Sequence, residues 1–144
     1  MSEDLFRILS LTVQVIGFSS ILISVRMVNR QIQSSVFCDY TKRFAEIFPD
    51  LSVFISETNM GMSFYDLPPD EQIELQIAMR KYLNLCAEEY HLVKSGYIAK
   101  STWREWESLM REIFKSRLMT EAGQSVLHEF KYFHGFYEFI RKMI

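Results

Sequence analysis

Residues 8 to 25 have the sequence ILSLTVQVIGFSSILISV, which contains no ionisable side chain. Together with Leu5 and Phe6, this stretch approaches the roughly 20 residues that a helix needs to cross about 30 Å of hydrocarbon. We therefore predict that residues 1–27 form a transmembrane helix.

Two alternatives to a membrane span stay open at this point. A secretory signal peptide has a basic N-terminal region and a cleavage site of small residues, whereas this chain begins with Glu3 and Asp4 and has no Ala-x-Ala after the apolar stretch. The second alternative is a buried helix of a soluble domain.

Charged residues beside the apolar stretch predict its orientation. Arg26 and Arg30 follow it directly, then Lys42 and Arg43, with only Asp39 among them as an acidic residue. Positively charged flanks are retained in the cytoplasm. We expect a single-pass protein of the inner (plasma) membrane, with its N-terminus outside and its C-terminal domain cytoplasmic. Cys38 and Cys86 would then lie in a reducing compartment, which suits unpaired thiols.

Small and polar residues of the stretch share one helix face. Ser10, Gln14, Gly17, Ile21 and Ser24 follow one another at steps of four, three, four and three. Small and hydroxyl-bearing residues let helices approach closely in lipid, and an intramembrane Gln seeks a polar partner. These five residues predict a seam for association with a second helix; a tolerated scatter of weakly polar residues is the alternative.

The first helix is predicted to continue past the membrane. No Gly or Pro occurs between Gly17 and Pro49, and apolar residues keep helical spacing up to Phe48. The helix is therefore expected to run from about residue 4 to 48, with residues 28–48 as a cytoplasmic stalk. We expect Pro49 to end it, because the residue before a proline is steered away from helical dihedrals.

Residues 49–144 have the pattern of a helical domain. A short helix is favoured over a single strand within 50–64. A long, central helix is expected from Pro69 or Asp70 to Ser95, ended by Gly96. The next helix is expected to begin with a capping box of Thr102 and Glu105. A fourth is expected from Thr120 towards Gly135, followed by a short aromatic helix. The predicted fold class is all-α: a long N-terminal transmembrane and stalk helix followed by a small helical bundle.

The aromatic residues after Trp103 have two interpretations. They fill the core of the bundle, or Trp103, Phe136 and Tyr137 form an interaction patch at the inner leaflet or on a partner, since such surfaces are enriched in Trp and Tyr.

Composition and motifs indicate few kinds of chemistry. Sixteen Lys and Arg against eighteen Asp and Glu give a net charge of −2, which disfavours nucleic acid as a partner. Glu88 and His91 form a single Glu-x-x-His, whereas di-iron bundles need that pair twice. We expect instead a solvated helix face with Glu88, Glu89 and Lys94 exposed. No catalytic motif, cofactor site, metal site or small-molecule substrate is predicted.

Three groups of residues carry a family resemblance. They are the segment from Arg80 to Tyr90 with its Glu-Glu-Tyr, the Gly-x-Ile at 96–98, and the paired tryptophans Trp103 and Trp106; the earlier Tyr40-x-x-Arg43 accompanies them. This combination resembles a bacterial family of unknown function whose members are short membrane-anchored proteins. The resemblance covers about residues 36–115. It implies an anchor followed by a helical domain and implies no activity.

Three hypotheses of function follow. The first is an accessory or scaffold protein, which associates with itself or docks on a larger membrane protein complex through its span and stalk. The alternative is a membrane-acting effector, such as a stress or phage-defence toxin, that oligomerises through its transmembrane helix. The third is a helical metalloenzyme that uses Glu88 and His91.

Overall fold

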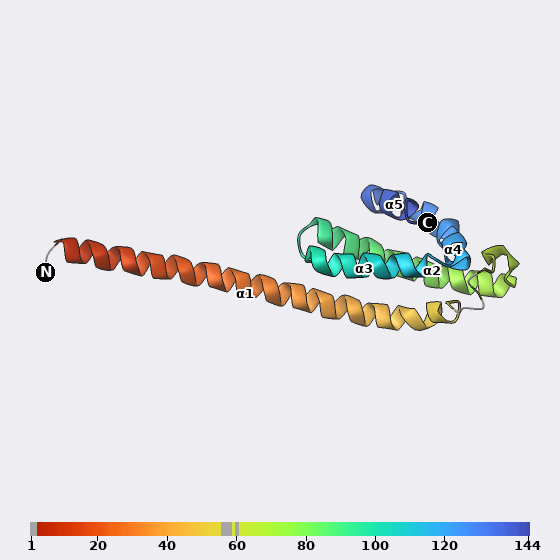
Figure 1. The fold of residues 1–144 in the computed structure, drawn as a ribbon, viewed down its shortest axis with the longest axis horizontal. Helices are drawn as coiled ribbons and strands as arrows, with labels where there is room; N and C mark the ends of the chain where they lie inside the picture. The colour runs from red at the N-terminus through yellow and green to blue at the C-terminus, as the bar shows by residue number, and fades with distance from the viewer. Residues whose placement is uncertain (1–2, 56–58, 60) are drawn as a thin grey trace. The chain divides into compact units, whose positions relative to one another are not determined.

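The chain consists of helices and turns in the residues that the computed structural model describes, which are 3–55, 59 and 61–144, with the backbone alone for 3–6 and 8–10. The elements in chain order are α1 (Glu3–Ser52), the short 3-10 helix η2 (Phe64–Asp66), α2 (Pro69–Lys94), α3 (Lys100–Ile113), α4 (Arg117–Leu127), the 3-10 helix η3 (His128–Phe130) and α5 (His134–Arg141) (Figure 1). No strand occurs in these described residues. The predicted all-α class, with a long apolar helix before a helical domain, is confirmed.

Two compact units divide the chain, residues Met1–Ser35 and Val36–Ile144. The described part of the first unit is helix α1 alone. The second unit contains the last part of α1 and every other element. Phe44 and Ile47 of α1 pack against the core of this unit, so the compact domain begins before the predicted boundary at residue 49.

Pro49 lies inside α1 and does not end it, which corrects the sequence-based expectation. The helix continues to Ser52, whose Oγ donates a hydrogen bond to the Pro49 carbonyl at 2.9 Å. Leu51, in this extra turn, is completely buried in the core. Burial of Leu51 stabilises a turn that local sequence disfavours, because tertiary packing outweighs a weak local preference. The separate helix expected within 50–64 is therefore wrong for residues 50–52, and part of that range lies outside the described residues.

Helix α2 has the predicted start and stop. Pro69 is its first residue, and Asp70 and Glu71 occupy its first turn, where the helix dipole favours negative charge. At the other end Gly96 has φ +78°, a conformation that glycine adopts without strain. The Tyr97 amide donates to the Leu92 carbonyl at 2.9 Å across this turn, as in a Schellman cap.

The predicted capping box of Thr102 and Glu105 is wrong. Helix α3 begins at Lys100, after Ala99 with extended backbone angles, and no side chain caps it. The Trp103 amide donates to the Ala99 carbonyl at 3.1 Å. Ile98 is buried and holds the chain at this point, so the helix starts at the first residues that follow, and Thr102 already lies within it.

The helix predicted from Thr120 towards Gly135 has different bounds. α4 begins earlier, at Arg117, and ends at Leu127, and the 3-10 helix η3 follows it. Gly135 does not end a helix, because it lies inside α5, the short aromatic helix that was expected next. Thr120 Oγ1 donates to the Phe114 carbonyl at 2.8 Å. That bond ties α4 to the residue that follows α3.

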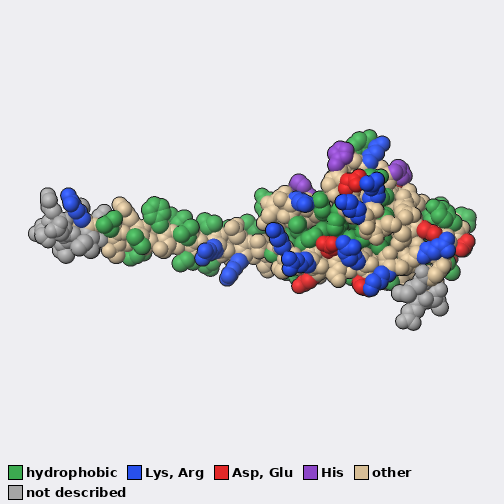
Figure 2. All heavy atoms as spheres, turned by 45° about the horizontal axis from the view of Figure 1, so that its top comes forward, with side chains coloured by type: hydrophobic (Ala, Val, Ile, Leu, Met, Phe, Trp, Pro, Cys, Tyr) green, Lys and Arg blue, Asp and Glu red, His purple; other side chains and the backbone are tan. Residues whose placement is uncertain are grey.

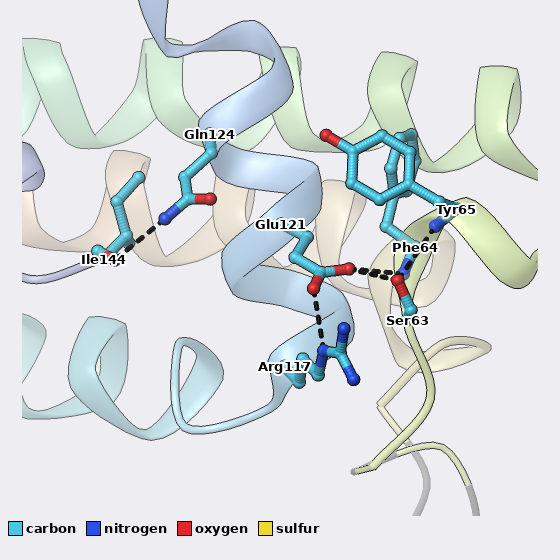
Figure 3. A network of polar contacts seen from close by, with 7 residues as sticks. All are labelled: Ser63, Phe64, Tyr65, Arg117, Glu121, Gln124 and Ile144. Carbon is cyan, nitrogen blue, oxygen red and sulfur yellow. Dashed lines mark hydrogen bonds and ion pairs between the residues drawn. The ribbon is translucent and has the colours of Figure 1, made fainter.

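A polar network joins α4 to the segment before α2 (Figure 3). The Ser63 hydroxyl and the Phe64 amide donate to Glu121 Oε2 at 2.6 and 2.9 Å, and Arg117 Nε donates to Oε1 at 2.7 Å. These donors, the Ser63 hydroxyl first, lower the pKa of Glu121. The network thereby fixes the position of η2 on α4.

Close packing of α4 on Phe114, the residue that follows α3, depends on Gly123. A Cβ added to Gly123 would lie 2.9 Å from Cε1 of Phe114, and Phe114 is itself buried and packs on the Tyr82 ring. The ring therefore has little room to withdraw.

We expect G123A to lower the stability of the folded chain by about 1 kcal/mol. Overpacking costs about 1–3 kcal/mol, and the better helix propensity of Ala returns part of it. Thermal unfolding of the full chain in detergent measures the effect. G61A is the matched control, because nothing lies within 4 Å of a Cβ at Gly61. Equal melting temperatures for G123A and G61A would contradict this account.

Candidate functional site

Helix α1 contains one stretch that is long and apolar enough to cross a membrane, within Leu11–Ser52 and near the N-terminus. Its apolar side chains are exposed, from Leu11 and Val13 to Val25 and Val28, with Phe18 at 70%. Figure 2 shows hydrophobic side chains along this segment and basic side chains after them. None of the apolar window is buried inside the structure, so the structure gives no support to the alternative of a buried helix of a soluble domain.

The predicted seam residues lie in this segment. Gln14, Gly17, Ile21 and Ser24 are all exposed; the side chain of Ser10 lies outside the described residues. Ser24 Oγ donates to the Ser20 carbonyl at 2.9 Å, which satisfies that hydroxyl within its own helix. Arg26 and Arg30 are exposed too.

A second set of polar residues joins α1 to α2 within the second unit. Arg43 donates to the two carboxylate oxygens of Glu88 at 2.6 and 3.1 Å, and the Tyr40 hydroxyl donates to Glu88 Oε2 at 2.9 Å. The guanidinium also lies 5.0 Å from the centre of the Tyr40 ring. Arg43 lowers the pKa of Glu88, while burial and then Glu88 raise the pKa of Tyr40 to about 12. This bidentate pair fixes the register of α1 on α2.

Glu89, the next residue, is buried at 6% exposure. The expectation that it lies on a solvated face with Glu88 and Lys94 is wrong for Glu89 and correct for the other two. No hydrogen bond or ion pair joins its carboxyl to any residue that the structure describes. Burial raises the pKa of Glu89 to about 8, against an opposing effect of Arg43. The group is therefore mainly protonated at neutral pH.

Glu89 lines a cavity of about 270 Å³ between α1, α2 and α3. Most of the other lining side chains are aromatic or apolar, and Glu105 and Thr41 add polar groups at its edge. Five aromatic rings line it: Phe37, Tyr40, Phe44, Tyr82 and Trp106. Phe37 stacks on Trp106 with ring centres 6.1 Å apart, and Tyr40 lies at the same distance from Trp106.

The predicted aromatic patch is not an exposed surface. Phe136 is 2% exposed and belongs to the core, and Trp103 and Tyr137 are half-buried against it. Trp103 packs on the rings of Tyr90 and Phe139 at 5.8 and 5.4 Å between centres. The interpretation of these residues as core packing is the one that the burial supports.

Glu88 and His91 do not form part of a metal centre in the described residues. Glu88 is held by Arg43 and Tyr40, and His91 is exposed. No three side chains of His, Cys, Asp or Glu gather closely enough there to hold a metal ion. Cys86 is buried, and burial raises the pKa of its thiol well above the ordinary value, as expected of an unreactive core cysteine.

The burial of Glu89 can be predicted from its spacing on α2, although its charge suggests exposure. Leu75, Met79, Tyr82 and Cys86 are buried and follow one another at helical steps of four, three and four. Glu89 is the next position of the same stripe, three residues on. Position on α2 therefore predicts burial, whereas the residue type alone predicts exposure.

Stability should fall as the pH rises from about 5 to about 8, because of Glu89. In the unfolded chain this carboxyl loses its proton near the ordinary pKa of 4.5, and in the folded chain only near 8. Between these values the folded state binds the extra proton, so deprotonation favours unfolding by an amount on the order of 5 kcal/mol. Urea unfolding across this pH range measures the slope.

The variant E89Q should lose most of this pH dependence and be the more stable protein at about pH 8. E112Q, which alters an exposed carboxyl paired with Lys115, is the control and should retain the wild-type slope. A slope unchanged in E89Q would show that Glu89 keeps an ordinary pKa in the folded chain.

Comparison of the chain with protein-family models, with curated proteins and with solved structures finds no match. The resemblance of residues 36–115 to a family of membrane-anchored proteins therefore stays a prediction. Several residues that carry it nevertheless lie together: Tyr40 and Arg43 bind Glu88, Glu89 shares a cavity with Trp106, and Tyr90 packs on Trp103.

Proposed function

We propose that this chain is a single-pass, membrane-anchored accessory or scaffold protein that acts through helix–helix association, either with a second copy or on a larger membrane complex. The observation that carries the proposal is the exposure of the apolar side chains of α1. Phe18, Leu22 and Val13 are each more than 60% exposed. Keeping such side chains in water rather than hydrocarbon costs about 1.5–3 kcal/mol each, and a lipid bilayer removes that cost.

The backbone of α1 suits a membrane interior. A helix satisfies its amide and carbonyl groups internally, as lipid requires. Ser20 Oγ and Ser24 Oγ donate to the Ile16 and Ser20 carbonyls, both at 2.9 Å. These hydroxyls therefore need no partner outside the helix.

Gln14 is different and supports the seam. Its side-chain amide makes no hydrogen bond to the residues that the structure describes, and in lipid an unsatisfied amide is costly. One turn away, Gly17 leaves open space beside the backbone, which permits close approach of another helix. A second helix packed at Gly17 could supply the hydrogen-bond partner that the Gln14 amide needs.

Charge supports an orientation with the second unit in the cytoplasm. Arg26 and Arg30 are exposed and pair with no acidic side chain in the described part of the chain. Unpaired basic residues directly after a span are held on the cytoplasmic side of the membrane.

The variants Q14L and G17L should each weaken self-association in detergent micelles by about tenfold, since packing and polar contacts between membrane helices contribute about 1–2 kcal/mol. Sedimentation equilibrium measures the association. S19L makes a similar change off the seam and should associate as wild type does. Wild-type association in Q14L and G17L, or equal weakening in S19L, would dismiss the seam. Growth arrest on expression that G17L abolishes would favour the membrane-acting effector over the scaffold.

Cys38 allows a test of orientation, because it is exposed while Cys86 is buried. A membrane-impermeant maleimide should leave Cys38 unlabelled in intact spheroplasts and label it after lysis. In a C38S background, E3C should be labelled in intact spheroplasts. Labelling of Cys38 before lysis would reverse the orientation. Recovery of the chain from the soluble fraction would dismiss the anchor, and a mature chain without its first residues would indicate a signal peptide.

A further inference from the structure

Five aromatic side chains line the cavity beside Glu89. α1 contributes Phe37, Tyr40 and Phe44, α2 contributes Tyr82, and α3 contributes Trp106. Phe44 and Tyr82 lie 6.2 Å apart between ring centres, and Trp106 packs on both Phe37 and Tyr40. Aromatic faces carry partial negative charge and attract cations that lie over them.

The charged groups of the cavity have one sign. Glu89 and Glu105 line it, and no Lys, Arg or His does. The nearest guanidinium is engaged elsewhere, since Arg43 makes two hydrogen bonds to Glu88 at 2.6 and 3.1 Å. A bound anion would therefore find no cationic side chain in the lining of this cavity.

The buried carboxyl of Glu89 has no hydrogen-bond or ion-pair partner among the described residues. Buried carboxyls are normally paired or hydrogen-bonded, because burial without a partner is costly. At 6% exposure this one has no hydrogen-bond or ion-pair partner among the described residues, although it lines an open volume. A positively charged group in the cavity would supply the missing interaction.

We propose that this cavity binds the ammonium group of a small aliphatic amine, with the five rings around the cation and the Glu89 carboxylate as its counter-charge. A metal ion fits poorly, because aromatic rings supply no ligands and no metal-binding group of three side chains forms in the described residues. A free amine is favoured over a lipid head group, since a phosphate would bring negative charge next to Glu89 and Glu105. The volume of about 270 Å³ suits a ligand of only a few heavy atoms.

Binding exchanges a proton for the amine. Below about pH 8 the Glu89 carboxyl is protonated in the empty site, and entry of the ammonium ion releases this proton to solvent while the amine keeps its own charge. The other titratable groups near Glu89 are Arg43 and Tyr40 on α1, Tyr82, Cys86 and Glu88 on α2, and Glu105 on α3. Tyr40, Tyr82 and Cys86 have raised pKa values, and Arg43 and Glu88 form an ion pair, so the proton is assigned to Glu89.

The full chain in detergent, titrated with butylammonium and with choline by calorimetry, tests the proposal. We expect saturable binding that tightens up to tenfold per pH unit between about pH 6 and pH 8, with release of one proton. E89Q should weaken binding at about pH 8 by tenfold or more and remove the pH dependence, and W106L should weaken binding and leave the proton release. E112Q should bind as wild type does. Because E89Q is expected to be the more stable protein, its loss of affinity cannot come from unfolding, which circular dichroism checks.

Titrations with neutral analogues and with a lipid head group can contradict the proposal. Butanol and 3,3-dimethylbutanol, which match the two ammonium ions in shape, should bind at least about tenfold more weakly. Equal affinity for the neutral analogues, unchanged affinity in E89Q, or no binding at millimolar amine would overturn the proposal. Tighter binding of glycerophosphocholine than of choline would overturn the assignment to a free amine. The residues concerned all belong to the second unit, so the result does not depend on the membrane function proposed above.

Discussion

Helix α2 must bury apolar side chains around most of its circumference, and this constraint organises the whole second unit. Leu75, Met79, Tyr82, Leu83 and Leu85 point in several directions, and each is at most 2% exposed. A helix that is apolar on most faces needs neighbours on most sides. The last part of α1 and helices α3, α4 and α5 supply them, with α4 making the most extensive contact. Gly123 permits part of this packing by letting α4 approach the ring of Phe114.

The same constraint gives two adjacent glutamates opposite environments. Successive residues of a helix are separated by about 100° around its axis. Glu88 therefore lies at the edge of the contact between α1 and α2, where Arg43 and Tyr40 reach it and solvent screens the pair. Glu89 lies one step further round, in contact with the aromatic residues of the cavity, and no basic side chain in the described part of the chain forms an ion pair with it. One becomes an ion pair that positions α1, and the other becomes a buried acid.

The length of the apolar stretch was predicted well because it depends on a pattern over many residues. The start of α2 at Pro69 and its stop at Gly96 were also predicted correctly, because there the local preference of one residue agrees with the packing. The errors fall where packing outweighs such a local preference. Pro49 and Thr102 were expected to mark helix ends, yet burial of Leu51 and Ile98 moved both boundaries.

The candidate site shows the same limit more sharply. The ring cluster and Glu89 come from three helices that are distant in sequence, so no spacing along the chain brings them together. The stripe position of Glu89 on α2 was visible, but the absence of a basic partner was not, since that depends on which residue Arg43 binds. Electrostatic environment is a property of the packed helices and not of any one of them.

Folding alone does not account for a glutamate at position 89. An apolar residue of similar size would bury at that stripe position without the cost of an unpaired carboxyl, and replacing buried charges by well-packed apolar groups is often neutral or stabilising. The cavity beside it is a further cost, because its lining lacks contacts that filling atoms would provide. Both costs are located at one place, and both are reduced when a compact cation occupies it: the rings gain contacts and the carboxylate gains a counter-charge. A proton neutralises the carboxyl too, but it adds no contacts to the rings. A compact cation neutralises the carboxylate and also packs against the rings, whereas a proton only neutralises the carboxylate. The volume and lining of the site therefore favour the cation.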